Sequence, residues 1–249
     1  MVEKLNCVDM SRWGGELTTQ EAQDMWNMGI THIIVGTGNP FGAGLWAKQQ
    51  ALKWLEVNPS GTVDAYIYLY MAGSASQQVS WGISSLSDVP IRMWWLDAED
   101  VESPELTPYQ RVVFLFDCVD AIGDKEVGIY TGRWWWIPYM DNSTAFYDMP
   151  LWNSYYDEEP DEDGLPYGGW EHSTIEQYKG TTDIAGQSVD LNYAKNLKEE
   201  NEMTNEELNQ IVQDLNTVMV KRMVLMEIGA GPMDRLLQAY DTLKAAGLI

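Results

Sequence analysis

Residues 91–99, Ile-Arg-Met-Trp-Trp-Leu-Asp-Ala-Glu, hold the pattern that decides the fold: an apolar run that ends in two acids. Runs of this kind are typical of β-strands, because they are rich in β-branched and aromatic residues and are bounded by Gly, Pro, Asp or Ser. They recur at residues 5–9, 31–36, 63–70, 91–97, 126–131, 150–155, 174–178 and 186–190.

Helix signals fall between several of these runs. Thr18 and Glu21 form a capping-box pattern, and Thr107 and Gln110 mark a second helix that is expected to stop at Gly123. About eight strands that alternate with helices predict an α/β fold, a closed parallel barrel of the TIM type. The later runs lack clear intervening helices, so the predicted barrel is irregular on that side.

The chain changes character after Tyr193, which divides it into a barrel over residues 1–194 and a tail over residues 195–249. The tail contains no strand-like run and no tryptophan, and its apolar residues recur at steps of three or four. We interpret it as an α-helical hairpin. It either packs on the barrel, targets the substrate, or forms a homo-oligomer through residues 204–247.

Charge and composition exclude several classes of function. The chain has 38 Asp and Glu against 15 Lys and Arg, a net charge of −23, which disfavours nucleic acid and anionic lipid as partners. It has only two His and two Cys, without a CxxC or HExxH motif, so we expect no metal site and no cofactor. Cys7 and Cys118 are interpreted as buried free thiols. No apolar run reaches the roughly 18 residues that a membrane span needs.

Four acids fall at or near strand ends: Asp9, Asp97, Glu99 and Asp190. Residues i and i+2 of a strand face the same side, and the carboxyl ends of barrel strands build the active site. We therefore expect Asp97 and Glu99 to point into the barrel mouth. The first and last strands of a closed barrel are neighbours, so Asp9 and Asp190 should meet there. Any one of these acids, taken alone, is also typical of a helix cap or a solvated turn.

Crowded carboxylates in an aromatic cleft suit glycoside hydrolysis, which needs one carboxylic acid and a negative charge nearby. Like charges raise the pKa of one group and keep it protonated near neutral pH. The chain has 12 Trp and 13 Tyr against 4 Phe, a composition that suits sugar stacking or, equally, a tryptophan-rich core. The candidate sugar-binding residues are Tyr66, Tyr68, Tyr130, Trp152 and Gln177.

The acidic segment over residues 157–163 has part of the ligand pattern of a calcium-binding loop. Glu159, Asp161 and Asp163 resemble the first ligands of such a loop. The twelfth position is Trp170, which has no carboxylate to offer a cation. We interpret the segment as a solvated loop at the rim.

Short motifs over residues 5–193 resemble, in order and spacing, glycoside hydrolase family 25, the Chalaropsis-type lysozymes. The second strand departs from the family pattern, because Val35-Gly36-Thr37-Gly38-Asn39 lacks the Lys and Glu found there. The matching segments are Val8-Asp9-Met10-Ser11-Arg12-Trp13, Ala65-Tyr66-Ile67-Tyr68, Trp94-Trp95-Leu96-Asp97-Ala98-Glu99, Gly128-Ile129-Tyr130-Thr131-Gly132, Pro150-Leu151-Trp152-Asn153-Ser154-Tyr155, Glu176-Gln177-Tyr178 and Val189-Asp190-Leu191-Asn192.

The resemblance implies an irregular β/α barrel that cleaves the β-1,4 bond between N-acetylmuramic acid and N-acetylglucosamine in bacterial peptidoglycan. Carried over by position, Glu99 would be the general acid and Asp97 would assist the N-acetyl group of the substrate. Asp9 and Asp190 would be the other carboxylates of the mouth. With no secretory signal visible, the resemblance further implies a phage endolysin that is made in the host cytoplasm and released by a holin, or an extracellular enzyme.

Two other classes of function stay open. One is a non-catalytic carbohydrate-binding or virion structural protein on the same barrel, although binding alone needs aromatics and amides more than crowded acids. The other is a Cys-His peptidase that uses Cys118 and His172. Cys118 lies in an apolar helical run, which favours a core thiol instead.

Overall fold

The computed structural model describes residues 5–195 except 12, 40–41, 44–45 and 162. The chain forms two compact units, residues 1–197 and 198–249, and the description that follows concerns the first. The helical hairpin and the homo-oligomer predicted from residues 204–247 lie outside the described residues.

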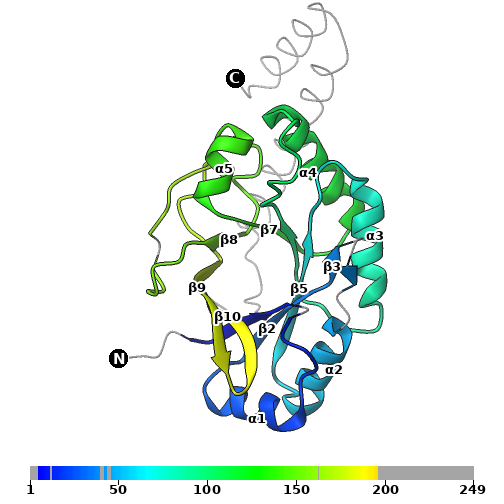
Figure 1. Cartoon of the computed structure of the whole chain (residues 1–249), viewed down its shortest axis with the longest axis vertical. Coiled ribbons are helices and arrows are strands. Elements are labelled where there is room, and N and C mark those ends of the chain that lie inside the picture. The colour runs from blue at the N-terminus through cyan, green and yellow to red at the C-terminus, as the bar shows by residue number, and fades with distance from the viewer. Residues whose placement is uncertain (1–4, 12, 40–41, 44–45, 162, 196–249) are drawn as a thin grey trace, which may run out of the picture. The chain divides into compact units, whose positions relative to one another are not determined.

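Eight strands close into a barrel in the order β1-β10-β9-β8-β7-β6-β5-β2, so the predicted barrel is confirmed (Figure 1). Two further short strands, β3 (Gly38–Asn39) and β4 (Gly42–Ala43), pair only with each other. The barrel strands are β1 (Cys7–Met10), β2 (His32–Gly36), β5 (Thr62–Tyr68), β6 (Trp94–Asp97), β7 (Val127–Thr131), β8 (Leu151–Ser154), β9 (Ile175–Ile184) and β10 (Gln187–Ala194).

The direction of β10 corrects the prediction of an all-parallel barrel. The other neighbouring strands pair in parallel, whereas β10 runs antiparallel to both β9 and β1. Ala185 and Gly186 both have positive φ, and this tight turn leads from β9 into β10 with no helix between them. As a result Asp190 lies within β10, where the pairing register shifts, and not at a strand end as predicted.

Five helices accompany the strands in the described part of the chain. Both predicted capping boxes are present, at Thr18 with Glu21 and at Thr107 with Gln110. Figure 1 shows α3 and α4 side by side along one flank of the barrel, with β9 and β10 on the other flank. Within the described residues, no helix has the length and apolar character to cross a membrane. The helices are α1 (Thr19–Asn27), α2 (Ala47–Val57), α3 (Ala75–Ser85), α4 (Pro108–Ile122) and α5 (Arg133–Met140).

Large aromatic rings fill the interior of the barrel. The indole of Trp152 meets Trp95, Tyr130 and Tyr66 edge to face, with ring centroids 5.9, 4.5 and 6.1 Å apart. Gly128 on β7 makes room for this layer, because a Cβ there would lie 2.4 Å from the Trp95 ring. The interpretation of a tryptophan-rich core therefore holds for much of the aromatic content.

The two cysteines are both free and buried, as predicted. Cys118 lies on α4, and burial raises the pKa of its thiol, so the reactive thiolate is disfavoured. His172 lies on an exposed stretch of the chain. The peptidase alternative is therefore not supported, since its nucleophile would sit inside the core.

Candidate active site

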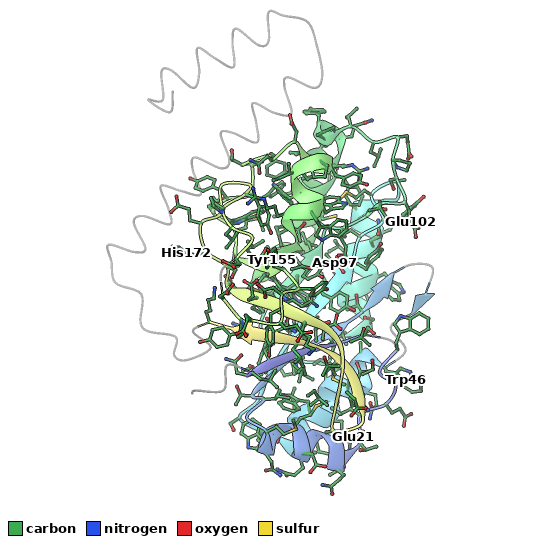
Figure 2. The ribbon with its side chains drawn as sticks, turned by 60° about the vertical axis from the view of Figure 1, so that its left-hand side comes forward. Glu21, Trp46, Asp97, Glu102, Tyr155 and His172 are labelled. Carbon is green, nitrogen blue, oxygen red and sulfur yellow. The ribbon has the colours of Figure 1, made fainter. Side chains whose placement is uncertain are left out.

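Strand positions bring the four predicted acids to one region of the barrel. Asp9 is the third residue of β1, and in the antiparallel register its Cα is directly opposite that of Asp190 on β10. Asp97 is the last residue of β6, and Glu99 follows two residues later. Figure 2 shows Asp97 in the central part of the molecule, between the labelled Tyr155 and Glu102.

The phenol of Tyr66 is subject to the charges of all four acids. Burial raises the pKa of Tyr66 well above its ordinary value, and the charges of Asp9, Asp97, Asp190 and Glu99 raise it further. One side chain is thus within electrostatic reach of all four carboxylates. Acids that are far apart in the sequence thus converge, as the strand positions indicate.

Gln177 on β9 links two of these acids through its side-chain amide. Its Nε2 donates to Asp9 Oδ2 at 2.7 Å and to Asp190 Oδ2 at 3.3 Å. Its Oε1 accepts from the hydroxyls of Tyr130 and Tyr156, each at 2.7 Å. Because a phenol hydroxyl donates to the oxygen of an amide, the two tyrosines fix the orientation in which Nε2 faces the carboxylates.

A second amide supports Asp9 from the neighbouring strand. Asn192 Nδ2 donates to Asp9 Oδ2 at 2.8 Å, and its Oδ1 accepts from Trp152 Nε1 at 2.7 Å. The side chain of Trp152 is only 2% exposed. Trp152 therefore stands behind the acids and holds Asn192, and it does not present a surface to a sugar.

The crowded acids hold protons at higher pH than isolated carboxyls do. Burial, and next the charge of Asp190, raise the pKa of Glu99 to about 7. Burial and Asp190 likewise raise the pKa of Asp9 to about 8, against the opposing effect of its amide donors. The pKa of Asp97 also lies well above its ordinary value, because the residue is buried near Glu99 and Asp9.

Burial also raises the pKa of Asp190, although a hydrogen bond from Thr181 N to Asp190 Oδ1 at 2.6 Å opposes the shift. No described basic side chain forms an ion pair with any of the four acids. The carboxyls therefore share a limited number of negative charges, and near neutral pH at least one of them is protonated.

A cavity of about 400 Å³ opens beside Asp9 and Asp190, a volume typical of small-molecule sites. The indole of Trp13 stands at its edge and is 76% exposed. Asp97 and Glu99 do not line this cavity. Its lining residues are Asp9, Ser11, Trp13, Thr181, Ser188, Val189 and Asp190.

The five predicted sugar-binding residues fall into two groups. Tyr66 and Tyr68 are half-buried, and Tyr68 pairs in register with Asp97. Tyr130, Trp152 and Gln177 are buried and contact the acids or their supporting amides. The structure thus brings all five to the acids or their supporting amides, and only Tyr66 and Tyr68 are partly exposed.

Three residues of the site were not predicted: Tyr156, Thr181 and Asn192. Asn192 had a readable signal, because strand alternation from Asp190 puts it on the same face. Tyr156 and Thr181 reach the site through the loop after β8 and through β9, so nothing in the local sequence indicates their part in it.

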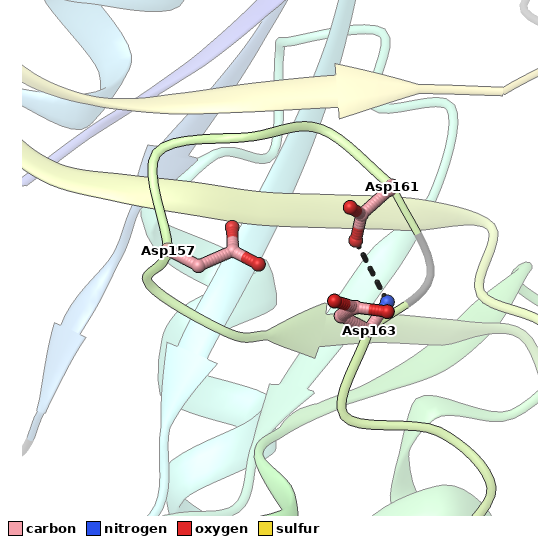
Figure 3. Close-up of side chains that lie close together, drawn as sticks. All are labelled: Asp157, Asp161 and Asp163. Atoms are coloured by element: carbon pink, nitrogen blue, oxygen red, sulfur yellow. Dashed lines mark hydrogen bonds between the residues drawn. The ribbon is translucent and has the colours of Figure 1, made fainter.

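The acidic segment gathers three further carboxylates. Asp157, Asp161 and Asp163 each place a carboxylate oxygen within 4.8 Å of the others (Figure 3). Asp161 Oδ1 also accepts a hydrogen bond from Asp163 N at 2.8 Å. Asp157 and Asp163 are exposed, which agrees with a solvated rim loop, and such clusters are common without an ion.

Comparisons with known proteins connect this geometry to one family. The sequence matches the model of glycosyl hydrolases family 25 over residues 8–187, more than half of the chain. It is 29% identical over 142 residues to "Probable GH family 25 lysozyme 3" of Dictyostelium discoideum, covering 53% of this chain and 29% of that protein. It is 32% identical over 106 residues to "Probable GH family 25 lysozyme 2" of the same organism, covering 41% and 49%. The chain spans less than half the length of either relative.

Solved structures share the fold. The family GH25 lysozyme from Aspergillus fumigatus superposes with a TM-score of 0.64 at 17% identity, covering 78% of this chain and 95% of that one. The muramidase from Acremonium alcalophilum superposes with a TM-score of 0.62 at 22% identity, covering 76% and 92%. Together with the matched family model, the converging acids and the closed barrel lead to one assignment: this chain belongs to glycosyl hydrolases family 25.

Proposed function

We propose that the chain is a peptidoglycan muramidase that hydrolyses the β-1,4 bond between N-acetylmuramic acid and N-acetylglucosamine. The observation that carries this proposal is Glu99, a partly exposed carboxyl with a pKa of about 7 among three other acids. A general acid works best when its pKa lies near the working pH. Glu99 meets this condition, and its side chain is partly exposed, whereas Asp9 and Asp97 are buried.

In this proposal Glu99 protonates the leaving oxygen. The N-acetyl oxygen of the substrate forms a bond to the anomeric carbon while the bond from that carbon to the leaving oxygen breaks. The proton of Glu99 moves to the leaving oxygen in the same step. Water then attacks the anomeric carbon and gives one of its protons to Glu99. The bond from the anomeric carbon to the N-acetyl oxygen breaks in this step, which restores the N-acetyl group.

Asp97 supports the cyclised intermediate of this mechanism. Its Oδ1 is buried without a hydrogen-bond partner among the described residues. An unpaired buried acceptor is costly, and the N–H of an N-acetyl group would satisfy it. Replacing Asp97 by Asn should therefore cost orders of magnitude in rate, whereas a small effect would argue against assistance by the substrate.

Burial and the charge of Asp190 keep Glu99 protonated, and Asp190 forms one wall of the cavity together with Asp9. Gln177 and Asn192 hold Asp9 in place. In this arrangement the two acids act on the field at the site and on sugar hydroxyls. They are not the proton donor.

Mass spectrometry of digested peptidoglycan tests the proposed bond specificity. A muramidase leaves new reducing ends on N-acetylmuramic acid, and the Glu99→Gln variant should yield none while staying folded by circular dichroism. New reducing ends on N-acetylglucosamine would contradict the proposed bond. Glycan binding by the wild type without any cleavage would support the non-catalytic carbohydrate-binding alternative.

The phage origin and the route to the cell wall stay predictions. If the chain acts as an endolysin, its expression in a bacterial cytoplasm should lyse the cells only after the membrane is permeabilised. Lysis without permeabilisation would contradict release by a holin.

A further inference from the structure

Arg111 on α4 is a buried cation without an acidic partner. It is 1% exposed, and among the described residues its guanidinium forms no ion pair with a carboxylate. Burying an arginine in this way is expensive unless its N–H groups are used. The residue does not touch the four acids of the site, so its burial is not explained by the mechanism described above.

Backbone carbonyls and aromatic rings surround the guanidinium instead. Nη1 donates to the carbonyl oxygen of Asp100 at 3.2 Å, and Nη2 donates to that of Ser103. The rings of Trp135 and Tyr139, stacked on each other, lie with their centroids 5.7 and 5.1 Å from the guanidinium carbon. Cation–π contacts of this kind stabilise a charge that is shielded from water.

The carbonyl of Asp100 receives a second donor, because Trp135 Nε1 binds it at 3.0 Å. On the other side of Glu99, the carbonyl of Ala98 accepts from Thr131 Oγ1 at 2.8 Å, and Ala98 N donates to the carbonyl of Tyr130. The carbonyl of the peptide before Glu99 and the carbonyl of Asp100, one residue after it, are therefore both held by side chains from other elements.

The side chain of Asp100 fastens the loop that follows. Its Oδ2 accepts from Met71 N at 2.8 Å and from Ser103 Oγ at 2.6 Å, and its Oδ1 accepts from Glu102 N at 2.7 Å. Glu99 itself makes no side-chain hydrogen bond to another described residue. Its carboxyl is therefore positioned by the backbone that carries it and by the packing around the side chain, with no hydrogen bond of its own.

We propose that Arg111, together with Trp135, is a positioning residue that holds the carboxyl of Glu99 in the site by clamping the carbonyl of Asp100. This inference rests on the proposed function, in which Glu99 is the general acid. A lysine at position 111 would keep the charge, but its single ammonium lacks the forked donors of a guanidinium that reach both carbonyls. A general acid that is misplaced by about 1 Å loses rate even though the substrate still binds.

Two tryptophans that are neighbours on α5 offer a matched test. Trp135→Phe keeps a buried ring and removes only the donor to Asp100. Trp136→Phe removes an equivalent buried donor, from Nε1 to the carbonyl of Ser143 at 2.9 Å. The ring of Trp136 lies beside that of Trp135, with centroids 6.3 Å apart, but Trp136 donates no hydrogen bond to Asp100. Trp135→Phe should lower kcat about tenfold or more with KM within about twofold, and Trp136→Phe should change neither. Arg111→Lys should behave as Trp135→Phe does.

A readout independent of turnover separates positioning from general loss of stability. In protein labelled with ¹³C at Glu side chains, the Glu99 carboxyl should titrate near its wild-type pKa in Trp136→Phe. In Trp135→Phe and Arg111→Lys the carboxyl becomes more solvated, so its pKa should fall toward that of an ordinary glutamate. Equal kcat losses in both tryptophan variants, or an unchanged Glu99 titration in Trp135→Phe, would overturn the proposal.

The same experiment distinguishes this inference from the proposed function. If the wild type does not cleave peptidoglycan, or if Glu99→Gln keeps full activity, the proposed function fails. The titration of Glu99 still reports in either case whether the clamp positions its carboxyl.

Discussion

At the scale of single residues, the proton-donating capacity of Glu99 depends on its burial and on the charge of one neighbour. Asp190 is the acid whose charge raises the pKa of Glu99 to about 7. When the pH is raised through about 7, kcat/KM of the wild type should therefore decrease, because Glu99 of the free enzyme loses its proton there. We call this decrease the alkaline limb of the pH profile.

Replacing Asp190 by Asn tests this dependence. The variant keeps an acceptor for Thr181 N but loses the charge, so the alkaline limb of kcat/KM should move to lower pH. Asp157→Asn in the acidic segment is the matched control, since Asp157 is not among the groups that shift Glu99. An alkaline limb that stays in place in Asp190→Asn would show that the charge of Asp190 does not set the protonation of Glu99.

At the scale of the strands, glycine decides how closely the aromatic layer packs. A Cβ at position 128 would lie 2.4 Å from the Trp95 ring and 2.9 Å from the carbonyl of Pro150. Gly128→Ala should thus lower the free energy of unfolding by about 1–3 kcal/mol, as overpacking of a core does. Gly180→Ala on β9 is the control, because its nearest neighbour would be 3.9 Å away. Equal midpoints of chemical unfolding in the two variants would contradict this account of the interior.

The strands were predictable because each leaves a local pattern, an apolar run of five to eight residues between turn signals. The direction of β10 was not, because it depends on the turn at Ala185 and Gly186 and on pairing with two distant strands. Asp190 looked like a strand end from its polarity. The strand continues past it to Ala194, since β1 supplies partners on the other side.

For the helices too, local sequence signals reveal some elements and miss others. Ser74 caps α3 by accepting from Gln77 N, a Ser-x-x-Gln pattern that the sequence does display. By contrast, α2 has Trp46 at its N-cap position without a side-chain hydrogen bond, and α5 contains Pro138 within a run of aromatics. These two helices are stabilised by tertiary packing, so local signals do not reveal them.

The candidate site likewise contains residues that the sequence reveals and residues that it does not. The four acids were identified from predicted strand ends, and their convergence depends on barrel closure and on the antiparallel register that puts Asp190 opposite Asp9. Supports such as Tyr156, which reaches Gln177 from a loop, depend on side-chain paths that only the folded structure defines.

At the scale of the whole molecule, the acidic site makes stability depend on pH. The folded-state pKa values of Asp9, Glu99 and Glu176 are raised to about 8, 7 and 8, and those of Asp97 and Asp190 are raised as well. Unfolded carboxyls titrate near about pH 4. Between these values the folded state binds more protons than the unfolded state.

The free energy of unfolding should therefore fall as pH rises from about 4 to about 8, by up to about 1.4 kcal/mol per pH unit for each such group. Asp64 and Glu21 have lowered pKa values in the folded state, so they reduce the free energy of unfolding only when the pH falls below this window. Chemical unfolding at about pH 5 and about pH 8 measures the slope, and Asp9→Asn should reduce it. Stability that is independent of pH, or that rises across this window, would contradict the raised pKa values.

The account depends above all on Glu99 as the proton donor at the point where four acids meet. The most direct test is the kcat of Glu99→Gln on a soluble, uncrosslinked glycan fragment of peptidoglycan, measured beside the wild type at the same thermal stability. We predict a loss of about 100- to 10,000-fold in kcat with little change in KM, the amount that a positioned general acid contributes. A Glu99→Gln variant that turns over within a few fold of the wild type would contradict the account.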